Sequence, residues 1–406
     1  MLTMEHRAFP ATGEQISLLG FGTMRLPRID PEKQDIDAQL GQQLIDYAYA
    51  HGVNYFDTAW PYHEGMSETF VGQALAKYPR ESYFLADKLP VFGGQLKNVP
   101  EAQKVFEEQL RKCRTDYFDF YLCHSVMGGE EFDRYYIETG ILDYLLAQQK
   151  AGRIRKLGFS FHGSPKGLEA MLNKRDWDFV QIQLNYLDWS YQRACDLYGM
   201  LDARGIPCII MEPVRGGALV SLCEESVALL KAARPQQSTA SWAIRFAASL
   251  PGVLTVLSGM STLEQVEDNV GTMTGFEPLT PADRQVLQQA LDAYLQKGTI
   301  PCTGCRYCMD CPVGIDIPKV FAVFNRCAAE GNLPITLEEQ EGPEFLAKAK
   351  AFLEAYDQLP VSGQAHNCVS CKHCTQVNHC PQHIKIHSRM KDIATIAALL
   401  RDAVEA

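Results

Sequence analysis

Eight short runs of apolar and β-branched residues alternate with amphipathic stretches between residues 18 and 259. The runs have the length and composition of buried strands, and the stretches between them carry apolar residues at helical spacing. The strand-like runs are residues 18–23, 53–58, 83–88, 118–124, 155–162, 179–185, 207–213 and 253–259. Helical periodicity is clearest at residues 37–52, 101–113, 132–152 and 238–250. Eight strand–helix units predict an α/β fold of the (β/α)8 (TIM) barrel type.

An open nucleotide-binding sheet is the main alternative to the barrel. Such a sheet carries a G-x-G-x-x-G motif after its first strand, and no such motif follows residues 18–23. The 406-residue chain is also longer than one hydrophobic core usually supports. We therefore expect the barrel in residues 1–297 and a small, mainly α-helical domain in residues 298–406, where the segments 317–331 and 343–359 have helical periodicity.

Composition restricts the setting and the partners of the chain. No apolar run approaches the ~20 residues that a membrane span needs, and the N-terminal residues lack the apolar core of a signal peptide. A net charge of −11 argues against nucleic acid as a partner. The sequence thus predicts a cytoplasmic protein with neither a membrane nor a nucleic-acid partner.

Four polar residues stand at or just after the ends of predicted strands. Asp57 ends the second strand, Tyr62 follows in the next loop, Lys88 ends the third strand and His124 ends the fourth. Each residue alone has a structural explanation, such as helix capping by Asp57 or core packing by His124. Because the active site of a (β/α)8 barrel lies at the C-terminal ends of its strands, we expect the four to form one site.

The chemistry of these residues suits carbonyl reduction. A tyrosine with a pKa of ~10 is a poor proton donor, and a neighbouring ammonium such as that of Lys88 lowers this pKa. Asp57 would pair with Lys88 and fix its position. His124 would donate a hydrogen bond to the substrate oxygen that gains negative charge.

The stretches "NYFDTAWPYHEGMSE", "LADK" and "YLCH" resemble the Asp-Tyr-Lys-His tetrad of the aldo-keto reductases. The resemblance covers residues 5–275. It implies that Tyr62 is the general acid, that Lys88 and Asp57 tune it, and that His124 orients a small-molecule carbonyl or alcohol substrate. It also implies direct hydride transfer with a bound NADH or NADPH.

The same resemblance assigns residues to the nicotinamide end of the cofactor. Ser160 and Gln181 match residues that hold the carboxamide. Met211 or Glu212 stands where many members stack a tyrosine on the ring, and Arg215 either approaches the pyrophosphate or is a solvated or helix-capping arginine. The motif "GFGTM" on the first strand adds Gly22, Thr23 and Met24.

The segment "VLSGMSTLEQVEDNV" matches the part of the family that binds the adenosine phosphate. It gives the candidates Gly259, Met260, Ser261, Thr262, Gln265 and Asn269. Members that prefer NADPH often place cations here, whereas this chain has Gly259 and Gln265 at the matching positions. The sequence therefore leaves the choice between NADH and NADPH open.

Aromatic residues are also expected near the mouth of the barrel. Trp60, His63 and Trp189 either wall the substrate pocket or pack within the protein. As pocket residues they would suit a fairly apolar substrate.

Eight of the 14 cysteines fall into two blocks after residue 300, "PCTGCRYCMDCP" and "NCVSCKHCTQVNHCP". Each block has three cysteines at three-residue steps and a fourth followed by proline, as in two-cluster bacterial ferredoxins. In those proteins the fourth cysteine of each block binds the cluster of the other block. That pattern predicts two 4Fe–4S clusters, one held by Cys302, Cys305, Cys308 and Cys380 and one held by Cys368, Cys371, Cys374 and Cys311.

Two tetrahedral zinc sites are the competing interpretation of eight clustered cysteines. The six other cysteines are scattered and are expected to be small core residues: Cys113, Cys123, Cys195, Cys208, Cys223 and Cys327. A tetrad barrel followed by the two cysteine blocks resembles the iron–sulfur-containing aldo-keto reductases. That resemblance implies a ferredoxin-like C-terminal domain, which either receives electrons from a ferredoxin-like partner or has a purely structural role.

Overall fold

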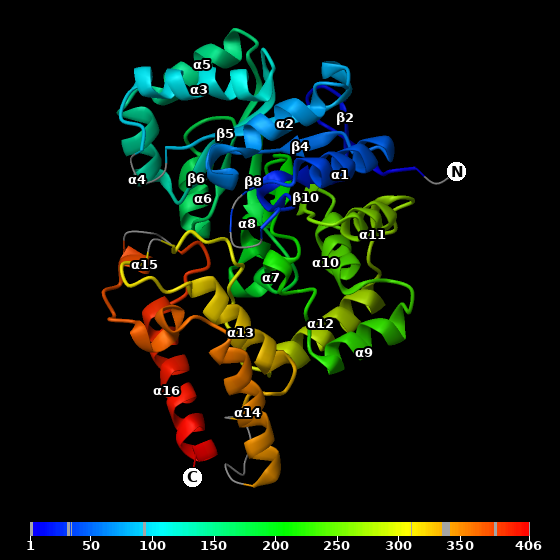
Figure 1. Ribbon diagram of the computed structural model, residues 1–406. Coiled ribbons are helices and arrows are strands. Elements are labelled where there is room, and N and C mark those ends of the chain that lie inside the picture. The colour runs from blue at the N-terminus through cyan, green and yellow to red at the C-terminus, as the bar shows by residue number, and fades with distance from the viewer. Residues whose placement is uncertain are drawn as a thin grey trace. The chain divides into compact units, whose positions relative to one another are not determined.

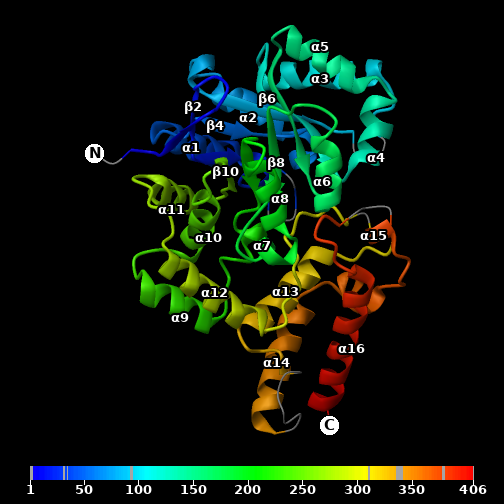
Figure 2. The same cartoon turned by 180° about the vertical axis from the view of Figure 1, so that it is seen from behind.

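The computed structural model describes residues 3–30, 33, 35–91, 95–309, 311–334, 342–376 and 380–405 (Figure 1, Figure 2). The chain forms two compact units. The first unit consists of Met1–Pro213 and Ala243–Leu279, and the second of Val214–Trp242 and Thr280–Ala406.

The first unit contains a closed barrel of eight parallel strands in the order β10-β3-β4-β5-β6-β7-β8-β9. The strands are β3 (Leu19–Gly22), β4 (Tyr55–Asp57), β5 (Phe84–Leu89), β6 (Phe118–Val126), β7 (Ile154–Phe161), β8 (Phe179–Gln183), β9 (Cys208–Met211) and β10 (Val253–Gly259). Each strand lies within one of the predicted runs or extends it by one or two residues. The predicted (β/α)8 barrel is confirmed.

Helices follow the strands along the chain and surround the barrel (Figure 1). They are α1 (Ala38–Ala50), α2 (Ser67–Leu75), α3 (Val99–Cys113), α5 (Ile141–Lys150), α6 (Pro165–Leu172), α8 (Ala194–Asp202), α10 (Thr239–Ala248) and α11 (Leu263–Met273). The N-cap side chains of Asp37 and Asn98 accept hydrogen bonds from the first turns of α1 and α3. These caps explain where the two predicted helices begin.

One predicted helix, at residues 132–152, is divided in the structure. The short helix α4 (Gly129–Phe132) continues into a π-helical turn at Asp133–Ile137, and α5 begins only at Ile141. Gly140 lies between them with φ of 75°. A residue in this left-handed conformation ends a helix, so the apolar periodicity runs across two separate elements.

An antiparallel hairpin that the sequence did not reveal precedes the barrel. Its strands are β1 (His6–Ala8) and β2 (Gln15–Ser17). Phe9 in the connection is 3% exposed and packs edge-on against Phe120 of β6, with ring centroids 5.9 Å apart. Phe9 thereby becomes part of the apolar core inside the barrel, together with Tyr55 and Phe179.

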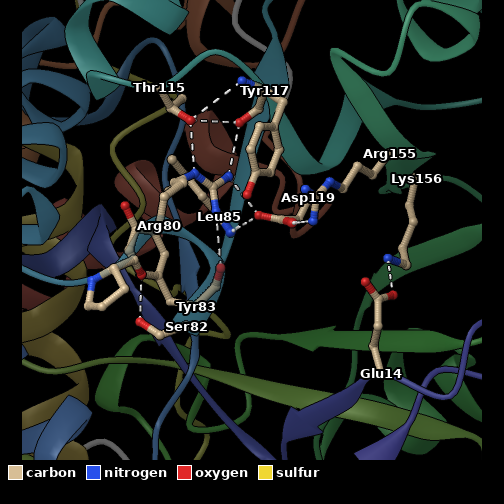
Figure 3. A network of polar contacts seen from close by, with 11 residues as sticks. Glu14, Arg80, Ser82, Tyr83, Leu85, Thr115, Tyr117, Asp119, Arg155 and Lys156 are labelled. Carbon is tan, nitrogen blue, oxygen red and sulfur yellow. Dashed lines mark hydrogen bonds and ion pairs between the residues drawn. The ribbon is translucent and has the colours of Figure 1, made fainter.

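A polar network ties together the N-terminal ends of β5, β6 and β7 (Figure 3). Asp119 on β6 is 1% exposed and receives Arg80 Nη2 at 2.7 Å and Arg155 Nη1 at 3.1 Å. Its Oδ2 also accepts the backbone N–H of Leu85 at 3.0 Å. Two arginines and a backbone donor thus compensate the buried carboxylate at this end of the barrel.

The second unit begins with a helix pair, α9 (Glu224–Ala233) and α12 (Pro281–Leu295). Ser226 Oγ donates to the backbone oxygen of Ala290 at 2.7 Å, and Arg234 Nη2 lies 2.6 Å from Asp283 Oδ2. These contacts join the two helices, and both belong to the unit that contains the C-terminal region. The compact units therefore divide the chain differently from the predicted boundary after residue 297, and that boundary stays a prediction.

The C-terminal region is helical, as expected. Its main helices are α13 (Ile317–Ala329), α14 (Pro343–Asp357) and α16 (Ile386–Glu405). They share a core that includes Phe321, Phe352, Tyr356 and Ile393. The first two match the predicted segments 317–331 and 343–359 to within two residues.

Two further expectations concern the whole chain. Within the part that the structure describes, no helix is long and apolar enough to cross a membrane. The scattered cysteines are buried, as predicted, with one exception: Cys195 is half-buried.

Close packing of α2 on α3 predicts a cost for any side chain at Gly72. A Cβ atom on Gly72 would lie 2.2 Å from the backbone oxygen of Lys112. We expect Gly72→Ala to lower the free energy of unfolding by about 1–3 kcal/mol, measured by urea titration. Gly199→Ala on α8 is the matched control, because no atom outside the local backbone of its own helix and its chain neighbours lies within 4 Å of its Cβ position. An unchanged midpoint for Gly72→Ala would contradict the packing described.

Candidate active site

The four tetrad candidates come together at the C-terminal ends of β4, β5 and β6. Lys88 Nζ donates to Asp57 Oδ1 at 2.6 Å and to the backbone oxygen of Thr58 at 2.7 Å. The same nitrogen lies 5.0 Å from the centroid of the Tyr62 ring. The Tyr62 and His124 rings meet edge-on, with centroids 6.5 Å apart. One ammonium, one carboxylate, one phenol and one imidazole therefore share a single site.

Tyr62 is carried by a 3₁₀ turn, Tyr62–Gly65, whose backbone is strained. His63 and Glu64 have φ values of 51° and 53°, a region that non-glycine residues rarely occupy. Ser67 at the start of α2 secures this loop, because its Oγ lies 2.8 Å from Thr23 Oγ1 and 2.9 Å from Thr58 Oγ1. Strain of this kind persists where surrounding contacts hold it, and it gathers at functional sites.

A buried polar group beneath the site supports the backbone of Lys88. Gln109 Nε2 donates to the backbone oxygen of Lys88 and to Glu68 Oε1, both at 3.0 Å. Glu68 Oε2 in turn receives Lys112 Nζ at 2.9 Å. Sequence reasoning missed Gln109 and Glu68, although a glutamate directly after Ser67 on the apolar helix α2 was a usable signal.

The electrostatics of Tyr62 differ from the sequence-based expectation. Burial around its hydroxyl raises the pKa of Tyr62 well above the ordinary value, and the charges of Asp57 and Glu212 act in the same direction. Arg25 opposes them. The sequence-based expectation was a lowered pKa, whereas burial and the nearby carboxylates raise it. The phenol therefore keeps its proton at neutral pH and is available as a donor.

The pKa values of Asp57 and His124 are also shifted. Burial raises the pKa of Asp57, while the charge and hydrogen bond of Lys88 favour its ionised form. Burial, Lys88 and His162 together hold the pKa of His124 well below the usual histidine range. A neutral imidazole carries one N–H donor, which suits the polarisation of a carbonyl oxygen.

The candidates for the nicotinamide end lie on neighbouring strands. Ser160 on β7 is the direct register partner of Gln181 on β8. Ser160 Oγ accepts the backbone N–H of Ser125 at 2.8 Å, and Gln181 Nε2 lies 3.5 Å from Met211 Sδ. Gln181 Oε1 is buried and has no hydrogen-bond partner among the described residues. An unsatisfied acceptor at this place fits the amide of a nicotinamide.

The candidates from the first and eighth barrel strands also meet. Gly22 at the end of β3 is the register partner of Gly259 at the end of β10. Thr23, which is buried, and Met24, which is half-buried, follow in a 3₁₀ turn at Thr23–Arg25. These positions form one continuous rim because β3 and β10 close the barrel.

The adenosine-phosphate candidates form the entry to α11. The Thr262 side chain caps this helix by accepting the backbone N–H of Gln265 at 3.3 Å, and Gln265 Oε1 accepts the backbone N–H of Ser261 at 2.8 Å. Asn269 is buried and donates to a serine of β10. Met260 is fully buried, and its role toward a ligand stays a prediction.

An ion pair that the sequence did not predict joins two edges of the rim. Arg25, directly after Met24, lies 3.6 Å from Glu212 at the end of β9, measured from Nη2 to Oε1. Glu212 has φ of 56°. Glu212 raises the pKa of Tyr62 and Arg25 lowers it, so the pair lies within electrostatic range of the tetrad.

The three aromatic pocket candidates lie in different surroundings. Lys112 Nζ lies over the Trp60 ring at 4.1 Å, and His63 is buried in the strained turn. Trp189 packs against Phe246 at 5.6 Å, in the short helix α7 (Asp188–Tyr191). Trp189 therefore packs within the protein, and a contribution of any of the three residues to a pocket stays a prediction.

Comparison with known proteins agrees with this geometry. The model of the Aldo/keto reductase family matches residues 18–292. The chain belongs to this family. As an aldo-keto reductase it is an oxidoreductase, and the family match ends before the first cysteine block.

Curated relatives and solved structures cover the same region. L-galactose dehydrogenase of Arabidopsis thaliana is 27% identical over 69% of this chain and 91% of its own length. NADH-specific methylglyoxal reductase of Escherichia coli is 24% identical over 68% of this chain and 95% of its own length. The holo form of an aldo-keto reductase from Bacillus halodurans has a TM-score of 0.58 and 25% identity, covering 71% of this chain and 96% of that chain.

A structure from a further bacterium shares the fold alone. It is an aldo-keto reductase from Klebsiella pneumoniae in complex with NADPH, at 20% identity and a TM-score of 0.56. The match covers 72% of this chain and 96% of that chain.

The first cysteine set of this aldo-keto reductase surrounds one small hollow in the C-terminal unit. The residues Cys302, Cys305, Cys308 and Cys380 all line it. Burial raises the pKa of Cys302 to about 12, with the neighbouring thiols of Cys305 and Cys380 adding to the shift. Cys380, from the second block, therefore lies with the triplet of the first block.

The second set shows the reciprocal grouping. Burial raises the pKa of Cys374 to about 11, and the thiols that add to this shift are those of Cys368, Cys311 and Cys371. Cys311, from the first block, thus lies with the triplet of the second. Both groupings have the composition of the predicted ligand sets, and ligation of clusters by them stays a prediction.

A single bound metal ion requires several ligand side chains close together. Among the residues that the structure describes, no three His, Cys, Asp or Glu side chains lie close enough together to hold one metal ion. A cubane of four iron and four sulfide atoms needs thiolates that stand farther apart, around a larger body. The two clusters and their ligands stay a prediction.

The low pKa of His124 can be tested directly. We expect its imidazole to stay neutral as the pH falls through about 6.5, where an ordinary histidine titrates. Because a nearby cation disfavours the imidazolium, Lys88→Met should raise the pKa of His124. NMR titration of the ring protons of His124 in the wild type and in the variant measures both pKa values. A wild-type His124 that titrates near 6.5 would contradict the electrostatics described.

Proposed function

We propose that the chain is an NAD(P)H-dependent carbonyl reductase, working in either direction on a small-molecule carbonyl or alcohol, and that it also carries two 4Fe–4S clusters. The observation that carries the reductase assignment is the contact set around Lys88. Its Nζ lies 2.6 Å from Asp57 Oδ1 and 5.0 Å from the Tyr62 ring, and His124 completes the group. Membership of the aldo-keto reductase family supports the same reaction class.

The residues divide the work of proton transfer and orientation. His124, neutral because of its lowered pKa, donates a hydrogen bond to the carbonyl oxygen. Tyr62 holds a proton and gives it to the same oxygen as negative charge develops there. Lys88, fixed by Asp57, favours the phenolate that remains.

Residues along the rim suit a nicotinamide cofactor. When bound, a reduced nicotinamide supplies the hydride that the carbonyl carbon accepts. Ser160 and Gln181 would hold its carboxamide, with the buried Gln181 Oε1 as the acceptor that still lacks a partner among the described residues. Gly22, Thr23 and Met24 would line the rim beside them, and the entry to α11 would receive the adenosine phosphate.

The comparisons support both forms of the cofactor. The Escherichia coli relative is named as NADH-specific, and the Klebsiella pneumoniae structure contains NADPH. Gly259 and Gln265 supply no cation for a 2′-phosphate, so we keep both NADH and NADPH. The names of the relatives include a sugar dehydrogenase and a methylglyoxal reductase, which supports small carbonyl substrates.

The cluster assignment rests on the two cysteine groupings. Cys302, Cys305, Cys308 and Cys380 would hold the first cluster, and Cys368, Cys371, Cys374 and Cys311 the second. Cysteines of both sets pack against the apolar core of the C-terminal unit. This packing favours a structural role, in which each cluster fastens two loops to the helices, over electron delivery from a ferredoxin-like partner.

Replacement of the proton donor tests the reductase assignment. We expect Tyr62→Phe to lower kcat for carbonyl reduction by about 10²–10⁴-fold, because a positioned general acid contributes that much. Cofactor affinity, measured by fluorescence quenching, should stay at the wild-type value. Tyr191→Phe, at an exposed position, is the control and should retain full activity. Full activity in Tyr62→Phe would reject the role of Tyr62.

Metal analysis tests the clusters. We expect Cys305→Ser to reduce the content of iron and acid-labile sulfide, because it removes one ligand of the first set. Cys195→Ser, outside both sets, should keep the wild-type content. Zinc without labile sulfide in the wild-type protein would replace the iron–sulfur assignment with the zinc alternative.

A further inference from the structure

A buried arginine lies beside the first cysteine set. Arg215 begins the 3₁₀ turn Arg215–Gly217 after β9 and is only 1% exposed. Removing a guanidinium from water is costly unless charge or hydrogen bonds compensate it. The sequence offered two roles for Arg215, a pyrophosphate contact or a solvated or capping residue. Its burial argues against a solvated role, the pyrophosphate contact stays a prediction, and the groups around the guanidinium indicate a further role.

One contact connects Arg215 to the fourth ligand of the first set. Arg215 Nη2 donates to Gln382 Oε1 at 3.0 Å, and Gln382 is 2% exposed. Gln382 stands two residues after Cys380 and lines the same hollow as the four cysteines. The guanidinium is therefore one side chain away from the proposed cluster.

The backbone next to Arg215 approaches the first ligand. Gly216 has φ of 64°, and a Cβ atom at this residue would lie 1.9 Å from the backbone oxygen of Thr303. Thr303 directly follows Cys302. The turn that carries Arg215 is thus packed against the Cys302 loop, while Gln382 holds the side chain from the Cys380 loop.

We infer that the guanidinium of Arg215 supplies a positive charge beside the first cluster and thereby raises the reduction potential of that cluster. The inference rests on the proposed cluster ligands. Reduction adds one electron and no proton to a group that four thiolates already make anionic. A buried cation stabilises the more negative, reduced form more strongly, and net charge and nearby hydrogen bonds are known determinants of such potentials.

A purely structural Arg215 would give a different result. Such a residue would only join the two cysteine loops through Gln382, and its loss would change iron content or stability. It would leave the potential of an intact cluster unchanged. The reduction potential at full iron content therefore separates the two roles.

The test is an EPR-monitored redox titration of the full chain with dithionite as the reductant. In Arg215→Met we expect the ratio of reduced to oxidised first cluster, at the wild-type midpoint, to fall about tenfold, which is about 59 mV for one electron. Arg215→Lys keeps the charge and should shift less. The second cluster serves as an internal reference and should not shift. Arg389→Met removes an exposed arginine of α16 and should leave both potentials unchanged.

Three outcomes would overturn the inference. One is an iron-replete Arg215→Met with the wild-type potential. If Arg215→Met loses iron, the test uses Gln382→Glu instead, which places a carboxylate next to the guanidinium. An unchanged reduction potential in iron-replete Gln382→Glu protein is the second outcome. Loss of iron from both variants is the third, because it assigns Arg215 a structural role. Failure of the cluster proposal is recognised separately, by wild-type protein without iron, labile sulfide or a reduced-cluster signal.

Discussion

Closure of the barrel by β10 and β3 is the constraint on which the candidate site depends. The pairing runs from Val256 with Leu19 to Gly259 with Gly22. Because all eight strands are parallel, closure brings every C-terminal end to one rim. Residues that are far apart in the chain thus become neighbours because their strands end at the same rim.

The ion pair of Lys88 with Asp57 joins two neighbouring strands at this rim. A buried pair contributes little net stability, since the loss of hydration offsets much of the attraction, whereas removing one partner costs about 3–5 kcal/mol. The pair is therefore better understood as a device for position. It holds an ammonium beside Tyr62, and the strained turn at His63 and Glu64 presents the phenol to it.

Packing in the C-terminal unit likewise brings together side chains that are far apart in the chain, here cysteines. In the sequence, one cysteine block precedes α13 and the other follows α14. The helices pack around a common apolar core. That packing brings Cys380 to the first triplet and Cys311 to the second. It also encloses Arg215 and Gln382, so one buried cation belongs to the surroundings of the first set.

Local patterns in the sequence determined the eight strands, the helices α13 and α14 and the four candidate residues of the tetrad. These features follow from spacing along the chain, which a strand or helix expresses directly. Tertiary structure alone decided the packing of Phe9 in the core of the barrel, the grouping of α9 with α12, the upward pKa shift of Tyr62 and the burial of Arg215. Burial and electrostatic interaction depend on residues distant in sequence, and no local period encodes which of these will meet.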